Sequence, residues 1–218
     1  MRVLVTGGAG FIGANLVRHL LAHDTDVVVL DDLSTGARSN LGDADITFVE
    51  GSILDTDLLD RVAAGADSIV HLAARPSVPR SVKDPVASHL ANATGTVNVL
   101  EAARRLDGAQ VIVASSSSVY GSNPSLPKHE DLATRPMSPY AASKLATEAY
   151  TLAYGATYSM PTLALRFFNV FGPLQAAGHA YAAVIPAFLD AVVAGRPCRS
   201  TATVPSPGTS PTWTPSPP

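Results

Sequence analysis

The sequence predicts an α/β fold with a doubly wound parallel sheet, followed by only the beginning of a smaller C-terminal lobe. Short runs rich in β-branched residues alternate with longer helix-like segments along most of the 218 residues. The runs are apolar throughout, which is typical of central parallel strands covered on both faces. Alternating strand and helix units favour a doubly wound sheet. Apolar residues make up 46% of the chain, enough for one sizeable core.

The expected elements follow one another in a regular order. A strand at 2–5 leads through a glycine-rich turn into a helix at 11–22. Further strands are expected at 27–30, 46–49, 68–72, 110–114 and 162–167. Helical periodicity predicts longer helices at 86–106 and 138–154, and the start of another at 184–194.

Charge and cysteine content exclude several classes of protein. The chain has 15 basic and 18 acidic side chains and a formal net charge of −3, so no electrostatic case exists for nucleic acid or an anionic membrane as partner. No apolar run reaches transmembrane length, and the first residues lack the features of a signal peptide. Cys198 is the single cysteine, so we expect neither disulfides nor a cysteine-based metal site, and we predict no metal. These features predict a cytoplasmic protein.

The segment TGGAGFIG, from Thr6 to Gly13, lies between the first expected strand and helix. Glycines at 7, 10 and 13 let the backbone turn tightly and approach a pyrophosphate, which would sit on the amino end of the helix. Three spaced glycines are also compatible with a purely structural turn. Their place between a strand and a helix favours dinucleotide binding.

Asp31 ends the second expected strand, 18 residues after Gly13. An acidic side chain at this point would bind the ribose hydroxyls of adenosine and repel a 2′-phosphate, which favours NAD over NADP. The competing interpretation is that Asp31 and Asp32 form only a solvated loop.

Two further segments carry groups suited to proton transfer. Residues 115–118 are four serines at the end of the fifth strand, and Tyr140 and Lys144 lie four apart on one helix face. A neighbouring ammonium, helped by an oxidised nicotinamide, would lower the pKa of a tyrosine from about 10 and make it a usable base. Tyr–Lys pairs are common on helix surfaces and serines often end strands. It is the order of all these features together that favours an enzyme.

With these motifs, the chain resembles an extended short-chain dehydrogenase/reductase of the NAD-dependent epimerase/dehydratase family, which has a Rossmann-type sheet. The similarity extends from Met1 to about Pro197. It rests on TGGAGFIG, DDLSTG at 31–36, HLAA at 71–74, NATGTVNVLEAAR at 92–104, SSSSVYG, YAASK and RFFNVFGP at 166–173.

The resemblance implies roles for individual residues. Tyr140 would be the acid/base, Lys144 would orient the nicotinamide ribose, and Ser116 would be their hydroxyl partner. The implied NAD-binding residues are Gly7, Gly10, Phe11, Ile12, Gly13, Asp31, Asp32, Ser52, Ile53, Leu72, Ala73, Ala74, Asn92, Tyr140 and Lys144. The implied substrate-binding residues are Ser77, Ser116, Ser117 and Asn169, of which Asn169 would contact the sugar-nucleotide diphosphate. Ser52 stands where the family usually has an aspartate, which lowers the expected cofactor affinity.

Two positions after Ser116 distinguish the reactions of this family. Dehydratases resemble one another in placing an acidic pair there, and related decarboxylases keep a glutamate. Ser117 and Ser118 cannot supply acid/base catalysis near neutral pH. The resemblance therefore implies 4-epimerisation of a UDP-hexose, N-acetylated ones included, through a 4-keto sugar. The alternatives are an NAD(P)-linked nucleotide-sugar oxidoreductase or dehydratase, and a non-catalytic NAD-binding remnant.

The segment 198–218 is dominated by Ser, Thr, Pro and Ala, whose codons share a middle C. A GC-rich gene read one base out of frame yields such a composition. Back-translation of residues 198–217 permits VDGDGTQSRDFTYVD in the shifted frame, which resembles the family's continuation. We therefore expect a lost base near codon 197 or 198. The competing interpretation is a genuine Pro-rich linker.

The expected organisation has three parts. Residues 1–175 would form the NAD-binding domain with the catalytic residues, 176–197 would begin a substrate-binding lobe, and 198–218 would be a disordered tail. Such a truncated chain is expected to bind NAD weakly and to epimerise very slowly or not at all. The resemblance also implies a homodimer through the helices around 86–106 and 140–154.

Overall fold

The computed structural model describes residues 1–106, 108–175 and 184–197, and the chain forms two units, Met1–Phe168 and Asn169–Pro218. The first unit contains a six-stranded parallel sheet of order β3-β2-β1-β4-β5-β6. Its strands are β1 (Arg2–Thr6), β2 (Asp26–Asp31), β3 (Thr47–Glu50), β4 (Ser68–His71), β5 (Gln110–Ser116) and β6 (Thr162–Phe167). The predicted doubly wound parallel sheet is confirmed.

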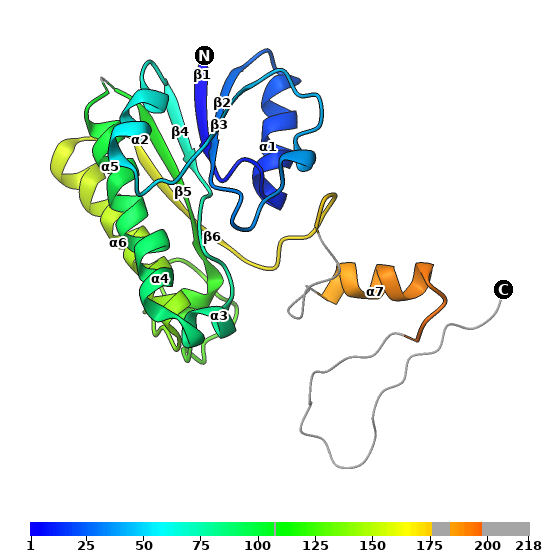
Figure 1. The fold of residues 1–218 in the computed structure, drawn as a ribbon. Coiled ribbons are helices and arrows are strands. Elements are labelled where there is room, and N and C mark those ends of the chain that lie inside the picture. Colours follow the sequence, from blue (N-terminus) through cyan, green and yellow to red (C-terminus); the bar gives the residue numbers. More distant parts are fainter. Residues whose placement is uncertain (107, 176–183, 198–218) are drawn as a thin grey trace. The chain divides into compact units, whose positions relative to one another are not determined.

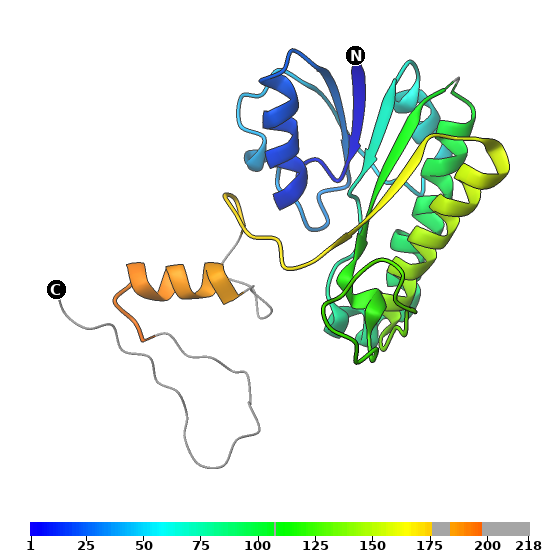
Figure 2. The same cartoon turned by 180° about the vertical axis from the view of Figure 1, so that it is seen from behind.

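Helices cover the two faces of this sheet. Helix α1 (Phe11–Leu21) lies on one face, and α2 (Thr56–Ala63), α5 (Gly95–Arg104) and α6 (Pro139–Tyr158) lie on the other (Figure 1). Figure 2 shows the same two layers from behind. None of the helices in the described part of the chain is both long enough and apolar enough to cross a membrane.

The central strands are buried on both faces, which explains their uniformly apolar sequences. Leu4 and Leu30 pack with Leu59 of α2 and Leu100 of α5 in one continuous cluster. The alternate valines of β1 and β2 point to the opposite face and are also fully buried. Strand β6 forms an edge of the described sheet, and there the leucines at alternate positions are exposed.

The helix predicted at 86–106 is in fact interrupted. Helix α4 (Pro85–His89) is followed by a π-helical turn, η2 (Leu90–Thr94), and then by α5. The hydroxyls of Thr96 and Thr147 both donate to the carbonyl oxygen of Asn92 within this turn, at 2.5 and 2.9 Å. Hydroxyls that bond backbone carbonyls compete with regular helical bonding. Helical periodicity does not show which side chains bond the backbone, so the interruption was not predicted from the sequence.

Two short helices were also missed by the sequence analysis. Asp55 begins α2, where its carboxylate accepts a hydrogen bond from the amide of Leu58 at 3.0 Å. Ser77 begins α3 (Val78–Lys83), and its hydroxyl accepts from the amide of Arg80 at 3.4 Å. Capping side chains of this type satisfy amides that the first turn leaves unpaired. The capping residues were the available signal for both helices.

The second unit contains helix α7 (Val184–Val193), close to the predicted 184–194. The predicted lobe at 176–197 is described only from residue 184 onward, and the predicted tail at 198–218 lies outside the described residues. The division of the chain into a cofactor domain and a substrate lobe stays a prediction.

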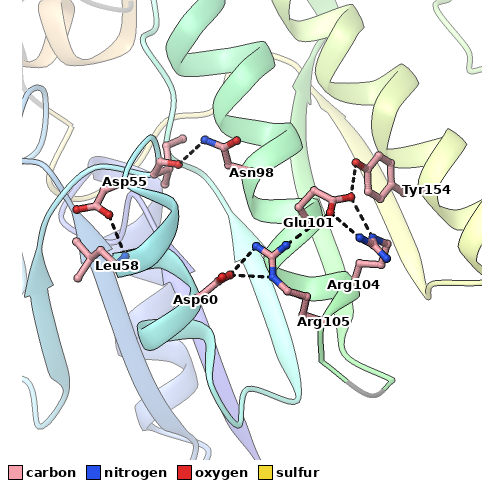
Figure 3. A network of polar contacts seen from close by, with 9 residues as sticks. Asp55, Leu58, Asp60, Asn98, Glu101, Arg104, Arg105 and Tyr154 are labelled. Atoms are coloured by element: carbon pink, nitrogen blue, oxygen red, sulfur yellow. Dashed lines mark hydrogen bonds and ion pairs between the residues drawn. The ribbon is translucent and has the colours of Figure 1, made fainter.

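A polar network joins α2, α5 and α6 (Figure 3). Glu101 accepts hydrogen bonds from Arg104 and from the hydroxyl of Tyr154, each at 2.8 Å. Arg105 donates to Asp60 of α2 at 2.8 Å and also lies near Glu101. The hydrogen bonds from Arg104 and then Tyr154 lower the pKa of Glu101 to about 2, although partial burial opposes the shift. Glu101 therefore connects three helices on one side of the sheet.

We predict that Glu101→Gln lowers the free energy of unfolding by about 1 kcal/mol at neutral pH, because a partly exposed charge network is lost. The folded-state pKa of about 2 lies below the ordinary 4.5, so this stability is present above pH 4.5 and is lost as the pH falls toward 2. The free energies of unfolding of wild type and variant, measured in urea, should therefore converge over that pH range.

Glu50→Gln is a suitable control, because Glu50 is exposed and forms no ion pair among the described residues. It should leave the stability unchanged. A difference between wild type and Glu101→Gln that does not depend on pH would contradict the role given to the Glu101 charge.

Candidate active site

The glycine loop between β1 and α1 brings two backbone segments unusually close. Gly7 has a φ of 74°, and a Cβ atom on it would lie 2.6 Å from the backbone nitrogen of Ala73. A Cβ on Gly13 would lie 2.2 Å from the carbonyl oxygen of Gly7. Both positions therefore require glycine. Helix α1 begins after Gly10, and among the described residues no side chain caps its first amides. This cradle fits a pyrophosphate at the helix terminus.

Asp31 lies against this loop at the end of β2. Its carboxylate accepts hydrogen bonds from the amides of Ala9 and Leu33, both at 2.9 Å. Burial raises the pKa of Asp31, and the two amides oppose that effect. Asp32 is exposed, and its carboxylate accepts instead from the amide and hydroxyl of Ser34. Only Asp31 is therefore placed beside the glycine loop.

The other predicted cofactor residues differ in what their side chains contact. Phe11 and Ile12 open α1 and are partly buried. Ser52 accepts from the amide of Leu54 at 3.1 Å. Ile53 belongs to the hydrophobic core, so its side chain packs inward. The NAD-binding role of these four residues stays a prediction.

The chain directly after β4 runs beside the glycine loop. The amide of Leu72 donates to the carbonyl oxygen of Thr6 at 3.0 Å, and the amide of Ala73 donates to its hydroxyl at 3.4 Å. Ala74 follows in the same irregular segment. The predicted residues 72–74 therefore lie next to the loop that is expected to bind the pyrophosphate.

Asn92 fixes the continuation of this segment. Its side chain accepts from the amide of Arg75 at 2.7 Å and donates to the carbonyl of the same residue at 3.2 Å. It also donates to the hydroxyl of Ser143 at 2.9 Å. Because Asn92 is 1% exposed, the structure places it as a buried support.

The predicted catalytic residues meet at the ends of β5 and α6. The hydroxyl of Ser116 lies near that of Tyr140 and acts to lower its pKa. Lys144 is 6% exposed, and its ammonium donates to the carbonyl oxygen of Ala114 at 2.8 Å. Ser138 caps the helix by accepting from the amide of Ala141 at 3.1 Å. Ser116, which is distant in the sequence from Tyr140 and Lys144, therefore lies in one cluster with them.

The lowering of the Tyr140 pKa by an ammonium together with an oxidised nicotinamide stays a prediction. In the chain alone, burial raises the pKa of Tyr140, and the nearby Ser116 hydroxyl only partly opposes it. Lys144 was expected to lower that pKa, but its ammonium is directed at Ala114. Burial lowers the pKa of Lys144 itself to about 8. Helical spacing placed the pair on one face without revealing how deeply both side chains are buried.

The predicted substrate-binding residues lie in both units of the chain. Ser117 lies beside Ser116 in a 3-10 turn, η3 (Ser117–Tyr120). Ser77 has a φ of 95°, a strained value for serine of the kind that clusters at functional sites. Asn169 is exposed and belongs to the second unit, and its substrate-binding role stays a prediction.

Sequence analysis missed a buried ion pair behind the catalytic residues. Glu148 accepts from Arg166 of β6 at 2.9 Å and from the hydroxyl of Ser115 at 3.0 Å. The hydrogen bond from Arg166 lowers the pKa of Glu148 despite burial. The guanidinium of Arg166 also lies 4.9 Å from the centre of the Tyr120 ring. The spacing of Glu148, four residues after Lys144 on the same helix, was the available signal.

The chain is similar to known proteins over most of its length. The model of the NAD dependent epimerase/dehydratase family matches residues 3–210. A UDP-glucose 4-epimerase of Mycolicibacterium smegmatis is 45% identical over 203 residues, which cover 90% of this chain and 64% of that protein.

Solved structures agree with this comparison. A UDP-N-acetylglucosamine 4-epimerase from Methanobrevibacter ruminantium, in complex with UDP-N-acetylmuramic acid, superposes with a TM-score of 0.85 at 39% identity. A Thermus thermophilus UDP-glucose 4-epimerase in complex with NAD superposes with a TM-score of 0.82 at 40% identity. Each comparison covers 90% of this chain and 64% of the other. The chain thus spans 64% of the length of these relatives, and by its family match it belongs to the NAD dependent epimerase/dehydratase family.

Proposed function

We propose that this chain carries the cofactor site and the proton-transfer residues of an NAD-dependent nucleotide-sugar 4-epimerase that acts on a UDP-hexose. The observation that carries the proposal is the placement of the Ser116 hydroxyl near that of Tyr140, one helical turn from the buried Lys144. The names of the most similar relatives support the same reaction.

The residues around the glycine loop fit NAD. Gly7 and Gly13 let the loop pack tightly on itself and on residues 72–74, and among the described residues no side chain caps the first amides of α1. Asp31 at the end of β2 favours a free 2′-hydroxyl over a phosphate, and hence NAD over NADP. When bound, NAD⁺ would accept a hydride from C4 of the sugar and return it to the opposite face.

The chain's own residues would manage the accompanying proton. Tyr140 would take the proton of the sugar 4-hydroxyl as the carbonyl forms, and would give it back after the 4-keto sugar has turned in the site. Ser116 would hold the reacting oxygen. Lys144, with a pKa of about 8, is mostly an ammonium at neutral pH and would orient the nicotinamide ribose.

The neighbours of Ser116 support epimerisation over dehydration. The hydroxyl of Ser118 donates to that of Ser116 at 2.9 Å. Neither Ser117 nor Ser118 can act as an acid or base near neutral pH. Elimination of water from a sugar needs such groups beside the reacting carbons, so the site suits a reaction that needs only Tyr140.

We also propose that two copies associate through α4, α5 and α6. The exposed apolar side chains of Val86 on α4 and Leu152 on α6, 67% and 55% exposed, support this surface. Contiguous apolar residues on a surface favour association. A cytoplasmic location stays a prediction.

We predict that Tyr140→Phe lowers the rate of UDP-glucose and UDP-galactose interconversion by about 10²- to 10⁴-fold, because the transferable proton is removed. The 218-residue chain would be supplied with NAD⁺ and the two sugars separated by chromatography, with slow turnover expected from wild type. Tyr150→Phe is the matched control, since Tyr150 is 46% exposed on the same helix.

Other outcomes would identify the alternative functions. Accumulation of free NADH would indicate a net oxidoreductase, and a dehydrated sugar would indicate a dehydratase. Turnover that is equal in wild type and Tyr140→Phe would contradict the proposed role of the phenol. NAD binding without any reaction would indicate a binding remnant.

We predict that Asp31→Ala weakens NAD binding about 10- to 100-fold, because hydrogen bonds to a charged group are lost, and reduces the preference for NAD over NADP. Calorimetric titration with both dinucleotides would measure the change. Asp43→Ala is the control, because Asp43 is exposed and is not among the predicted NAD-binding residues. An unchanged NAD affinity in Asp31→Ala would refute the assignment.

A further inference from the structure

His71 is a buried side chain that neither the cofactor nor the proton-transfer assignment uses. It ends β4 and is 3% exposed. Its ring Nδ1 lies 2.7 Å from the hydroxyl oxygen of Thr6, and its Nε2 lies 3.1 Å from the hydroxyl oxygen of Thr96. Both threonines are fully buried. The ring therefore bridges β1, directly before the glycine loop, and the first turn of α5.

The neighbouring contacts determine which ring nitrogen carries the proton. The hydroxyl of Thr96 donates its single proton to the carbonyl of Asn92 at 2.5 Å. Its oxygen must then accept from His71, which places the ring proton on Nε2. At the other end, the hydroxyl of Thr6 accepts from the amide of Ala73 and can donate its own proton to Nδ1. The Thr6 end is therefore compatible with the tautomer that the Thr96 end requires.

The bridge continues to the catalytic helix through Asn92. The carbonyl of Asn92 receives the Thr96 hydroxyl, and its side chain donates to the hydroxyl of Ser143 at 2.9 Å. Ser143 in turn donates to the carbonyl of Tyr140 at 2.8 Å. One continuous series of hydrogen bonds thus runs from the residue before Gly7 to the backbone of Tyr140.

The ring is also kept neutral. Burial, followed by the nearby charge of Lys144, lowers the pKa of His71 to about 3. A neutral imidazole can donate from one nitrogen and accept at the other, as this bridge requires.

We propose that His71, held as the neutral Nε2–H tautomer between Thr6 and Thr96, is a positioning residue. It fixes the position of the glycine loop relative to Tyr140. The link to cofactor binding rests on the proposed function, whereas the tautomer and the bridge do not. Because His71 is 3% exposed, it would act through the residues that it joins.

The first test needs no ligand and no activity. In the full chain labelled with ¹⁵N-histidine, long-range ¹H–¹⁵N spectra distinguish the two tautomers, and the His71 signals are assigned by their loss in His71→Asn. We expect a protonated Nε2 and a bare Nδ1 that do not titrate between about pH 5 and pH 8. A proton on Nδ1, or titration in this range, would overturn the proposal.

The second test changes only the bridge. Thr96→Val keeps the shape of the side chain without its hydroxyl, and Thr96→Ser restores the hydroxyl. We expect Thr96→Val to shift the His71 nitrogen resonances, to speed amide exchange of residues 7–14 and to raise the NAD dissociation constant about tenfold. Thr96→Ser should return all three readouts to within about twofold of wild type.

A matched variant separates positioning from general loosening. Thr151 is fully buried on α6, and its hydroxyl donates to the carbonyl of Thr147 within the same helix. Thr151→Val should leave all three readouts unchanged. Equal effects of the two valine variants, or no effect of Thr96→Val on amide exchange, would overturn the proposal. Failure of the wild-type chain to bind NAD would refute the proposed function, and the tautomer and exchange measurements would still decide the role of His71.

Discussion

The carboxyl ends of six parallel strands meet at one edge of the sheet, and every part of the site depends on this constraint. The strand order reverses between β1 and β4, and in open α/β sheets ligands bind at such a switch point. The glycine loop follows β1, Asp31 ends β2, residues 72–74 follow β4 and Ser116 ends β5. Residues that are distant in the chain become neighbours because all strands run in one direction.

Helix α6 acts as a rigid support on which the proton-transfer residues are spaced by whole turns. Tyr140, Lys144 and Glu148 lie four residues apart on the face that meets β5 and β6. The ion pair of Glu148 and Arg166 is almost buried, with side chains 10% and 16% exposed. Such a pair offsets its desolvation only with good geometry and further hydrogen bonds, which Ser115 supplies. It holds the helix against both strands near Ser116.

The parts that the sequence revealed are those governed by local pattern. The apolar runs predicted the strands, and the glycine spacing and the position of Asp31 predicted the loop. The burial of Tyr140, which raises the pKa of its phenol, could not be seen in the sequence. The interruption at Leu90–Thr94 was hidden for a related reason, because hydroxyls from α5 and α6 create it. Burial in the folded chain and the contact from Thr147, 55 residues from Asn92, could not be predicted from the local pattern.

The buried bridge through His71 also has a consequence for how the chain folds. Thr6 and His71 are 65 residues apart, and Asn92 and Ser143 are 51 apart. Forming such long-range contacts costs the conformational entropy of closing large loops before the contacts stabilise the fold. Topologies dominated by these contacts fold slowly. The catalytic geometry therefore cannot assemble from a local piece of the chain. It emerges only when β1, β4, α5 and α6 have all docked, so a correctly formed site reports completion of the whole first unit.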